Sequence, residues 1–397
     1  MIAVADAHAR TLALIARPTP PEPLPLVRAL GRVLAQDVAA PFDVPPADNS
    51  AVDGYAVRGA DLVPGGRTRL RVAQDLPAGA VFQGVLGPGE VLRIMTGASI
   101  PAGADTVVPQ ELAERDGDIV VLAAVEPGAN VRARGEDVRA GVPVLARGAV
   151  LRPQELGLLA SLGFREVAVH RRPRVALLST GDEVVDPGQP RQPGQIYDAN
   201  RFSLLGLVEA AGGLAIDRGI VPDCHAELRA RLVEAAADAD VVLTSGGVSV
   251  GDYDFVKAVL AELGGIDFWQ VAMQPGRPLA VGQIGGTHFF GLPGNPVASV
   301  LCFLLFVRPA LWKLAGRRDL EPLRFTARAT EPMPKKTGRR EFKRGILRFT
   351  PDGWEVGTTG PQGSGILSSM VAANCLIILE EPRGDVRPGE PVLVEPL

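Results

Sequence analysis

The amino-acid sequence predicts a multidomain α/β plus β protein, in which a central doubly wound, mostly parallel α/β domain is joined to two β-rich domains. Residues 170–316 alternate apolar runs, loops and helical patterns, as in a parallel sheet covered by helices. Residues 41–137 and 317–397 contain short β-like runs separated by turn residues, which is typical of small all-β domains. We therefore expect a small inserted β-rich domain and a C-terminal β-barrel-like domain.

The N-terminal residues are predicted to form a helix and an extended stretch. The helical periodicity of "VADAHARTLALIA" ends before the prolines that run from Pro18 to Pro25, because proline interrupts helical hydrogen bonding. After the inserted domain, residues 138–169 return to a strand and a helix pattern. We expect residues 1–40 and 138–169 to pack together as an elongated linker or dimer domain.

The two β-rich domains are each predicted from five short runs. In the inserted domain the runs are "YAVRG", "RLRVAQDL", "EVLRIMTG", "DTVVP" and "DIVVLAAV". In the C-terminal domain they are "RFTARAT", "GILRFT", "WEVGTT", "ANCLIILEE" and "PVLVEPL". The second set would fit a barrel or a sandwich.

Four strand–loop–helix units follow one another in the α/β region. The first helix is expected to begin at Asn200, whose side chain could cap it. The carboxyl ends of parallel strands share one edge of the sheet, and ligands bind in the crevice outside that edge. Four loops fall there: "STGDE", "VPD", "TSGGVSVGDYD" and "LPGNP".

The bulk composition argues against several classes of protein. The formal net charge of −4 lacks the basic excess of a nucleic-acid-binding surface. Cys224, Cys302 and Cys375 lie far apart, which favours a reduced, cytoplasmic protein. The start "MIAVADAHAR" lacks the features of a signal peptide. The most apolar run, residues 297–307, is too short to cross a bilayer, so we expect a core helix and no membrane contact.

Acidic residues gather in the loops at the predicted strand ends. A single acid at the start of a helix can be only a cap or a partner of the helix dipole. A set of carboxylates that converge on one crevice needs a cation, and ligands that are all oxygen are typical of Mg²⁺. Both interpretations are open for these acids, which are Asp182, Glu183, Asp223, Asp252 and Asp254.

The loop "LTSGGVSVGDYDF" has glycines but no Walker lysine. Gly246, Gly247 and Gly251 would let the backbone approach a phosphate or a planar ligand, which the acids would reach through a metal ion. A tight turn before a capped helix is the alternative.

Two further segments allow two interpretations each. In "LPGNP", prolines fix φ and stiffen the loop, which could be a wall of a binding crevice or a plain connector. The basic run "KKTGRREFKRG", residues 335–345, could be a solvated face or could neutralise a polyanionic small molecule. The four histidines belong to no catalytic motif and are expected to be structural or surface residues.

Eight segments together resemble one known family. They are "DVPPADNSAVDGYAV", "IMTGASIPAGAD", "RGEDV", "STGDE", "IYDAN", "TSGGVSVGDYD", "PGRP" and "GLPGNP". In this order they are similar to the signature segments of the molybdopterin molybdenumtransferases, which are the bacterial MoeA proteins and the gephyrin E domain. The resemblance runs from about residue 26 to the C-terminus.

The resemblance implies a function in molybdenum cofactor biosynthesis. Molybdenum from molybdate would be inserted into adenylylated molybdopterin with the assistance of Mg²⁺, and AMP would be released. It also implies an elongated homodimer, in which the active site lies between the α/β domain of one subunit and the small β domain of its mate. Contact with the molybdopterin adenylyltransferase and with molybdoenzyme apoproteins is implied as well.

The resemblance carries functional positions over to this sequence. Glu183 and Asp254 would handle Mg²⁺ or molybdate, and Asp53 and Thr96 would position the ligand across the dimer. The other implied catalytic positions are Asp137 in "RGEDV" and Asp223 in "IVPD". The implied binding positions are Gly246, Gly247, Ser249, Arg277, Pro293, Asn295, Pro296, Arg339, Ser368 and Ser369.

The sequence departs from the family pattern in "FWQVAMQPGRP". Gln270 and Gln274 stand where some relatives have lysines, and a glutamine donates hydrogen bonds without adding charge. Arg277 could supply the positive charge instead.

Two other functions compete with this one. A molybdopterin adenylyltransferase would share the α/β domain but would be short and would have an "SGGTG" type of loop, whereas this chain has "SGGVSVG". A dimeric scaffold is the non-enzymatic alternative, but the chain has no long linker of the kind a scaffold would use.

Overall fold

The computed structural model describes residues 1–77, 79–247 and 254–397. These residues form two compact units. The large unit comprises residues 1–35, 148–152 and 166–397, and the small unit comprises residues 36–147 and 153–165.

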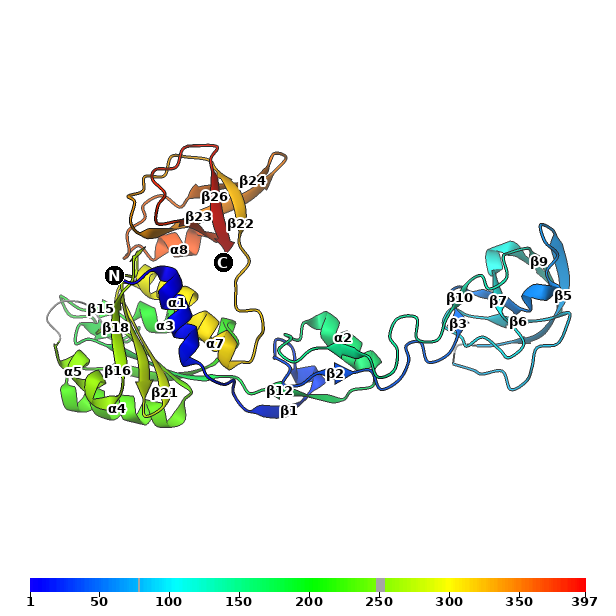
Figure 1. Ribbon diagram of the computed structural model, residues 1–397, viewed down its shortest axis with the longest axis horizontal. Coiled ribbons are helices and arrows are strands. Elements are labelled where there is room, and N and C mark those ends of the chain that lie inside the picture. The colour runs from blue at the N-terminus through cyan, green and yellow to red at the C-terminus, as the bar shows by residue number, and fades with distance from the viewer. Residues whose placement is uncertain (78, 248–253) are drawn as a thin grey trace. The chain divides into compact units, whose positions relative to one another are not determined.

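The small unit is built around a six-stranded sheet, as expected for the inserted β-rich domain (Figure 1). Strand β5 alternates buried and exposed side chains, because one of its faces covers a buried core. Strand β4 is buried throughout, since Tyr55 and Val57 belong to that core while Ala56 belongs to a second cluster on the other face. The strand order is β7 (Thr106–Pro109), β4 (Gly54–Val57), β6 (Glu90–Ile94), β5 (Arg67–Asp75), β9 (Ile119–Ala123) and β8 (Ala113–Asp116).

Short strand pairs and one helix complete the small unit. Both pairs are antiparallel. They join β3 (Asn49–Ser50) to β10 (Val131–Arg132) and β2 (Val38–Ala39) to β11 (Pro143–Leu145), and the helix is α2 (Pro153–Ser161).

The large unit contains the predicted doubly wound sheet. Four neighbouring strands are parallel, and an antiparallel pair extends one edge. This antiparallel pair, β20 and β18, was not recognised in the sequence, where their apolar residues form no strand–helix unit. The order is β16 (Leu214–Val221), β13 (Arg174–Thr180), β17 (Val241–Ser245), β21 (Thr287–Leu292), β20 (Pro278–Ile284) and β18 (Ile266–Gln270).

Helices cover both faces of this sheet, which explains why its strands are apolar throughout. In β13, Val175 and Leu177 pack on one face, while Ala176 and Leu178 pack on the other. The first face holds α3 (Ala199–Ala210), α6 (Pro296–Cys302), η4 (Phe303–Val307) and α7 (Arg308–Leu314). The second face holds α4 (His225–Asp238) and α5 (Asp254–Leu263).

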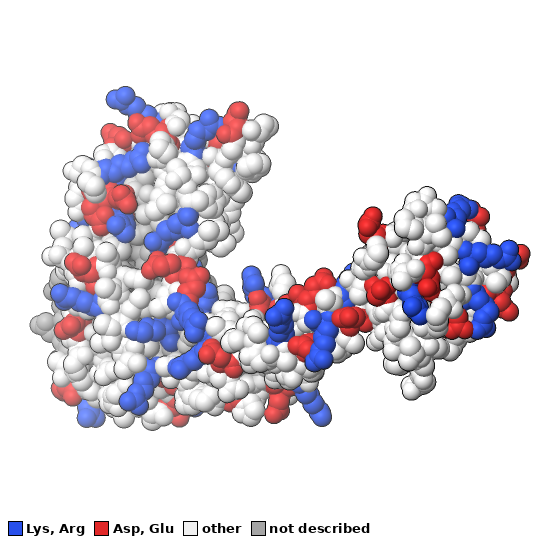
Figure 2. All heavy atoms as spheres, turned by 45° about the vertical axis from the view of Figure 1, so that its right-hand side comes forward, with Lys and Arg blue, Asp and Glu red and all other residues white. Residues whose placement is uncertain are grey.

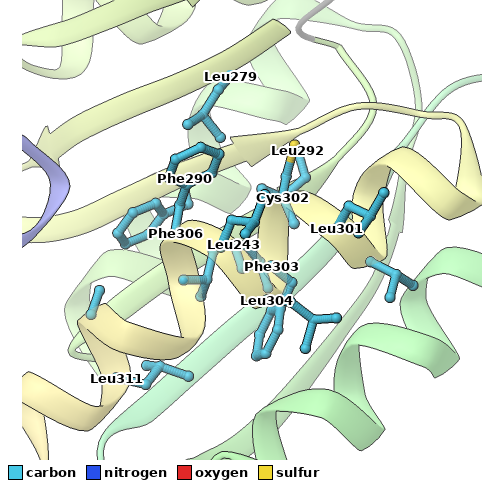
Figure 3. Close-up of a cluster of buried hydrophobic side chains, with 14 of the residues drawn as sticks. Leu243, Leu279, Phe290, Leu292, Leu301, Cys302, Phe303, Leu304, Phe306 and Leu311 are labelled. Atoms are coloured by element: carbon cyan, nitrogen blue, oxygen red, sulfur yellow. The ribbon is translucent and has the colours of Figure 1, made fainter. Parts of the chain in front are cut away.

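The most apolar segment of the chain is the core helix that the sequence predicted. Phe303, Leu304 and Phe306 lie among Leu243, Phe290 and other strand side chains in one buried cluster (Figure 3). By length and composition, Pro296–Leu314 could also cross a membrane, but 83% of its most apolar window is buried inside the protein.

The N-terminal helix α1 (Val4–Leu14) packs into the core of the large unit. Val4 and Ala7 belong to the same buried cluster as the core helix, and Lys313 Nζ donates to Leu12 O at 2.8 Å. We expected this helix to pack with residues 138–169 instead. Its small apolar side chains fit the crowded surface of α7, a fit that periodicity does not reveal. The division into four domains remains a prediction.

A ribbon and a barrel complete the large unit. The ribbon joins β1 (Pro21–Pro25) to β12 (Glu166–His170). The C-terminal strands close into a five-stranded barrel, because β23 pairs with both β24 and β25, so the barrel prediction is confirmed. The barrel strands are β22 (Phe325–Ala329), β23 (Arg340–Thr350), β24 (Gly353–Thr358), β25 (Cys375–Leu379) and β26 (Pro391–Pro396), with β19 (Met273–Gln274) added beside β23.

A buried carboxylate links this barrel to the core helix. Glu395 is fully buried and accepts from Arg308 at 2.6 Å and from Arg324 at 2.9 Å. Removing one partner of a buried ion pair leaves uncompensated charge, at a cost of about 3 kcal/mol.

We therefore expect Glu395→Ala to lower the free energy of unfolding by about 3 kcal/mol, as measured by denaturant titration. Glu355→Ala removes a solvent-exposed pair with Arg328 and should cost at most about 1 kcal/mol. Equal losses in the two variants would contradict this assignment.

Candidate functional site

The four parallel strands bring the described parts of all four predicted loops to one edge of the sheet. Strand β13 lies between β16 and β17, and β17 lies beside β21. The chain leaves β13 toward β16 and then crosses to β17 on the opposite side, so a topological switch point lies between β13 and β17. Ligands bind at such points in open α/β sheets.

Hydrogen bonds tie the loops to one another. The Gly246 amide donates to Leu292 O at 3.0 Å. Asn200 Nδ2 donates to Ser245 Oγ at 2.8 Å and to Gly294 O at 2.7 Å. The helix cap predicted at Asn200 is wrong, since Asp198 caps α3 by accepting from the Arg201 amide. Asn200 is the second residue of α3, two positions after the cap, and its side chain joins the ends of β17 and β21 instead.

Gly246 occupies a position that other residues would strain. Its φ is +97°, in a region that L-residues rarely adopt. A Cβ atom there would lie 3.0 Å from Thr180 O, at the end of the neighbouring strand. Glycine is required here because two strand ends approach each other closely.

A cavity of about 590 Å³ opens at this edge, wholly within the large unit. Eight of the positions implied by the resemblance line it: Glu183, Asp223, Gly246, Gly247, Arg277, Pro293, Asn295 and Arg339. The "LPGNP" segment is therefore a wall of a cavity as well as a connector.

One side of the cavity is acidic. Glu183 and Asp223 line it, and Asp182 accepts a hydrogen bond from the Asp223 amide at 3.0 Å. Burial raises the pKa of the Asp223 carboxyl, and the nearby charges of Asp182 and Glu183 raise it further. Carboxylates that disfavour one another's ionisation would be relieved by a cation.

These residues fit a partly hydrated Mg²⁺ rather than a complete protein cage. Among the described residues, no group of three or more acidic, histidine or cysteine side chains is arranged to hold a metal ion. Mg²⁺ commonly uses only one or two protein carboxylates and completes its octahedron with waters and substrate phosphates. Glu183 and Asp223 could supply the two carboxylates.

Another part of the cavity lining is cationic. Arg277 and Arg339 line it, and within the described residues neither makes an ion pair. Gln274, one of the two departures from the family pattern, also lines the cavity. On the face shown in Figure 2, basic and acidic side chains are interspersed over the surface.

The basic run at residues 335–345 is mostly internal, so its interpretation as a solvated face is wrong. Lys335 is 6% exposed and Arg344 is fully buried, while Arg340 pairs with Glu381 at 3.1 Å. Closure of the barrel turns this strand inward, which a count of basic residues does not reveal.

Arg344 supports a wall of the cavity that the sequence did not indicate. Its Nη2 donates to Gly363 O at 2.9 Å, and its amide donates to Gln362 Oε1 at 2.8 Å. Gln362, Gly363 and Ser364 line the cavity. Arg344 Nη1 is buried without a partner in the described structure, and burial lowers the pKa of the guanidinium group. Within the described residues this cation makes no ion pair, so it adds positive potential beneath the wall.

Three of the implied binding positions that the structure describes lie outside the cavity lining. Ser368 is exposed, and Ser369 is buried where its Oγ accepts from Arg344 Nε at 2.9 Å. Pro296 begins α6 and lines a smaller neighbouring cavity of about 100 Å³. The segment "PQGSG", residues 361–365, contains the lining residues Gln362 and Ser364. These residues were not recognised in the sequence, because small polar residues in such a segment are typical of an ordinary turn.

Asp53, Thr96 and Asp137 belong to the small unit. The Thr96 amide and hydroxyl donate to Asp53 Oδ1 at 2.7 and 2.8 Å. The bond from the Thr96 amide lowers the pKa of Asp53 most, and the bond from the Thr96 hydroxyl lowers it further. Asp137 is exposed, and its amide donates to Val44 O. The structure thus joins Asp53 to Thr96 but does not gather Asp137 with them.

Ser249, Gly251 and Asp252 lie outside the described residues. Asp254 begins α5, but its side chain also lies outside the described part. The assignment of Ser249 to binding and of Asp254 to metal remains a prediction.

Replacement of Gly246 tests the close approach of the strands. Gly246→Ala should lower the free energy of unfolding by about 1–2 kcal/mol, because alanine is strained at positive φ. Gly206→Ala, within helix α3 where nothing lies within 4 Å of an added Cβ, should stabilise by about 0.5–1 kcal/mol. Chemical denaturation of both variants measures these changes, and an unchanged Gly246→Ala would refute the constraint.

Comparison with known proteins matches the whole chain to one family. The MoeA N-terminal region (domain I and II) matches residues 2–163, a probable molybdopterin binding domain matches 176–313, and the MoeA C-terminal region (domain IV) matches 326–397.

Individual relatives agree with these matches. A molybdopterin molybdenumtransferase from Haemophilus influenzae is 44% identical and covers 100% of this chain and 98% of the relative. Molybdopterin molybdenumtransferase 2 from Mycobacterium tuberculosis is 40% identical, with 96% of each chain covered. The crystal structure of a MoeA protein of molybdopterin biosynthesis from Pyrococcus horikoshii superposes with a TM-score of 0.87 at 32% identity, covering 100% of both chains. The chain belongs to the molybdopterin molybdenumtransferase family of enzymes.

Proposed function

We propose that this protein transfers molybdenum from molybdate to adenylylated molybdopterin, with release of AMP, as a Mg²⁺-dependent step of molybdenum cofactor biosynthesis. The observation that carries the proposal is the cavity at the switch point of the α/β sheet, whose lining combines Arg277 and Arg339 with Glu183 and Asp223. Family membership supports the type of reaction, and the charges of the cavity support the choice of ligands.

The cationic side suits the anionic groups of both substrates. Adenylylated molybdopterin carries phosphates and molybdate is an oxyanion, and arginine pairs well with such groups through its fork of N–H donors. Arg277 and Arg339 are free to make these contacts because neither is used in an ion pair within the described residues. They would bind and orient the substrates.

The glycines of the β17 loop suit close approach to a phosphate. Gly246 and Gly247 line the cavity and both have positive φ, so no side chain separates the backbone from the ligand. The buried charge of Arg344 adds a positive field beneath Gly363, which would stabilise an anion in the cavity.

The acidic side would hold the metal ion. Glu183 and Asp223 are the carboxylates that would bind Mg²⁺, and the ion when bound would neutralise phosphate charge while the bond to AMP breaks. Without the ion, these two carboxylates would repel the same phosphates.

We also propose that two copies of the chain assemble as a homodimer and share sites. Asp53 and Thr96 lie in the part of the chain that matches the MoeA N-terminal region, yet both residues belong to the small unit. The Asp53–Thr96 pair of one copy would complete the cavity of the other. Contact with the adenylyltransferase that supplies the substrate belongs to the same proposal.

Turnover of the purified protein tests the reaction. Adenylylated molybdopterin, molybdate and Mg²⁺ together should give AMP, and removal of either molybdate or Mg²⁺ should abolish its release. Glu183→Gln should lower the rate by at least about tenfold through weaker metal binding. Glu227→Gln, at an exposed position in the first turn of α4, should not change it.

Two results would overturn this function. AMP release that needs no molybdate would contradict the transfer of molybdenum. Adenylylation of molybdopterin from ATP would instead favour an adenylyltransferase.

Mixed dimers test the shared site. Asp53→Ala and Glu183→Ala should each be inactive alone. Unfolding the two together and refolding them should restore about a quarter of wild-type activity, because half of the dimers are mixed and each mixed dimer keeps one intact site. Refolded single variants are the control. If light scattering finds dimers but the mixture stays inactive, sharing of sites is refuted.

A further inference from the structure

Lys335 is a buried cation that neither the family resemblance nor the proposed reaction uses. The residue is 6% exposed and begins the basic run before β23. Its Nζ lies 3.5 Å from Glu381 O and makes three shorter bonds, donating to the carbonyl oxygens of Arg339 and Arg383, both at 2.9 Å, and of Lys336 at 3.1 Å. An ammonium group has three N–H donors, so these three bonds satisfy it. Its bonding partners are backbone groups rather than carboxylates.

The Lys335 ammonium closes the turn that carries Arg339. Its bond to Arg339 O joins the two ends of the turn at residues 335–339. The middle of the turn is exposed at Lys336, Thr337 and Gly338, so packing contributes little to its conformation. In the middle of the turn, the Gly338 amide donates to Glu381 O at 2.8 Å and adds a second hydrogen bond that holds it.

The same turn is joined to another wall of the cavity. The Arg340 amide donates to Ala272 O at 2.9 Å, and Met273 and Gln274 pair with β23 in register. Gln274 and Arg339 both line the cavity. The position of the Arg339 backbone therefore depends on the ammonium on one side and on the strand pairing on the other.

We propose that Lys335 is a positioning residue, whose ammonium group fixes the turn so that the Arg339 guanidinium faces the cavity and meets the adenylylated molybdopterin anion. The inference rests on the proposed function for the identity of the ligand. Lys335 acts only through Arg339 and does not touch the substrate.

The nearby charges agree with a charged Lys335. Burial lowers the pKa of the ammonium, while the carboxylates of Glu341 and Glu381 oppose this effect. Three carbonyl dipoles at hydrogen-bond distance also favour the charged form.

A double-mutant cycle tests the inference. Lys335→Met keeps the length of the side chain and removes every donor. It should weaken the binding of adenylylated molybdopterin about ten- to hundredfold, because small displacements of a binding group have effects of this size. Arg339→Ala should weaken binding to the same extent, and the double variant should bind no worse than Arg339→Ala alone. Lys336→Met, the same change at the exposed neighbour, should bind like the wild type.

The binding is measured by calorimetry without molybdate, so it is independent of turnover. A wild type that binds adenylylated molybdopterin but releases no AMP would refute the proposed function and leave this test intact. A wild type that does not bind would refute both. Faster amide exchange at Gly338 and Arg340 in Lys335→Met should accompany the loss of affinity.

Three results would overturn the positioning role. They are additive effects in the double variant, a normal affinity of Lys335→Met despite faster exchange in the turn, and a normal affinity of Arg339→Ala. If Lys335→Met does not fold, Lys335→Gln replaces it in the cycle. Glutamine keeps two N–H donors, so its loss of affinity should be smaller than tenfold and should again vanish in the Arg339→Ala background.

Discussion

The cavity depends on the parallel pairing of β13, β17 and β21. Parallel pairing sends three chain segments out of the sheet at one edge, and burial of both faces under helices keeps the strands in register. Asn200 then joins Ser245 to Gly294 by side-chain hydrogen bonds. Without the parallel pairing, Glu183 and Gly246 would lie in separate turns and would not line the same cavity.

The carboxylates and the arginines of the cavity lining decide which ligands the cavity can bind. The loops after β13 and β16 supply the carboxylates of Glu183 and Asp223, and the segments beside β20 and β23 supply Arg277 and Arg339. An anion that binds together with a cation compensates both sets of charges, because the anion pairs with the arginines and the cation with the carboxylates. Either ion alone would leave one of these sets without a counter-charge. A phosphorylated substrate with Mg²⁺ meets this requirement.

The barrel contributes through cations that are buried beneath the surface of the cavity. Arg344 holds the segment of Gln362 and Gly363 from below, and Lys335 holds the turn of Arg339. Neither has a carboxylate among the hydrogen-bond partners of its side chain in the described structure. Backbone and hydroxyl oxygens accept hydrogen bonds from these two cations instead. The bonds hold the two segments of the cavity lining in place, and because the acceptors are uncharged they do not cancel the positive charge.

The sequence by itself determined the α/β region, the β-rich regions and the family, because hydrophobic period, turn residues and ordered motifs are local properties of the chain. It also indicated most of the cavity lining, since the carboxyl ends of parallel strands are recognisable as loops between strand and helix patterns. Only the tertiary structure decided that Asn200 joins two strand ends instead of capping a helix, and that α1 packs into the core of the large unit. It also decided that Lys335 and Arg344 are buried while Arg339 lines the cavity. Those outcomes depend on contacts between segments that are far apart in the chain. For Lys335, Arg339 and Arg344, closure of the barrel decides which side chains are buried and which remain free to bind.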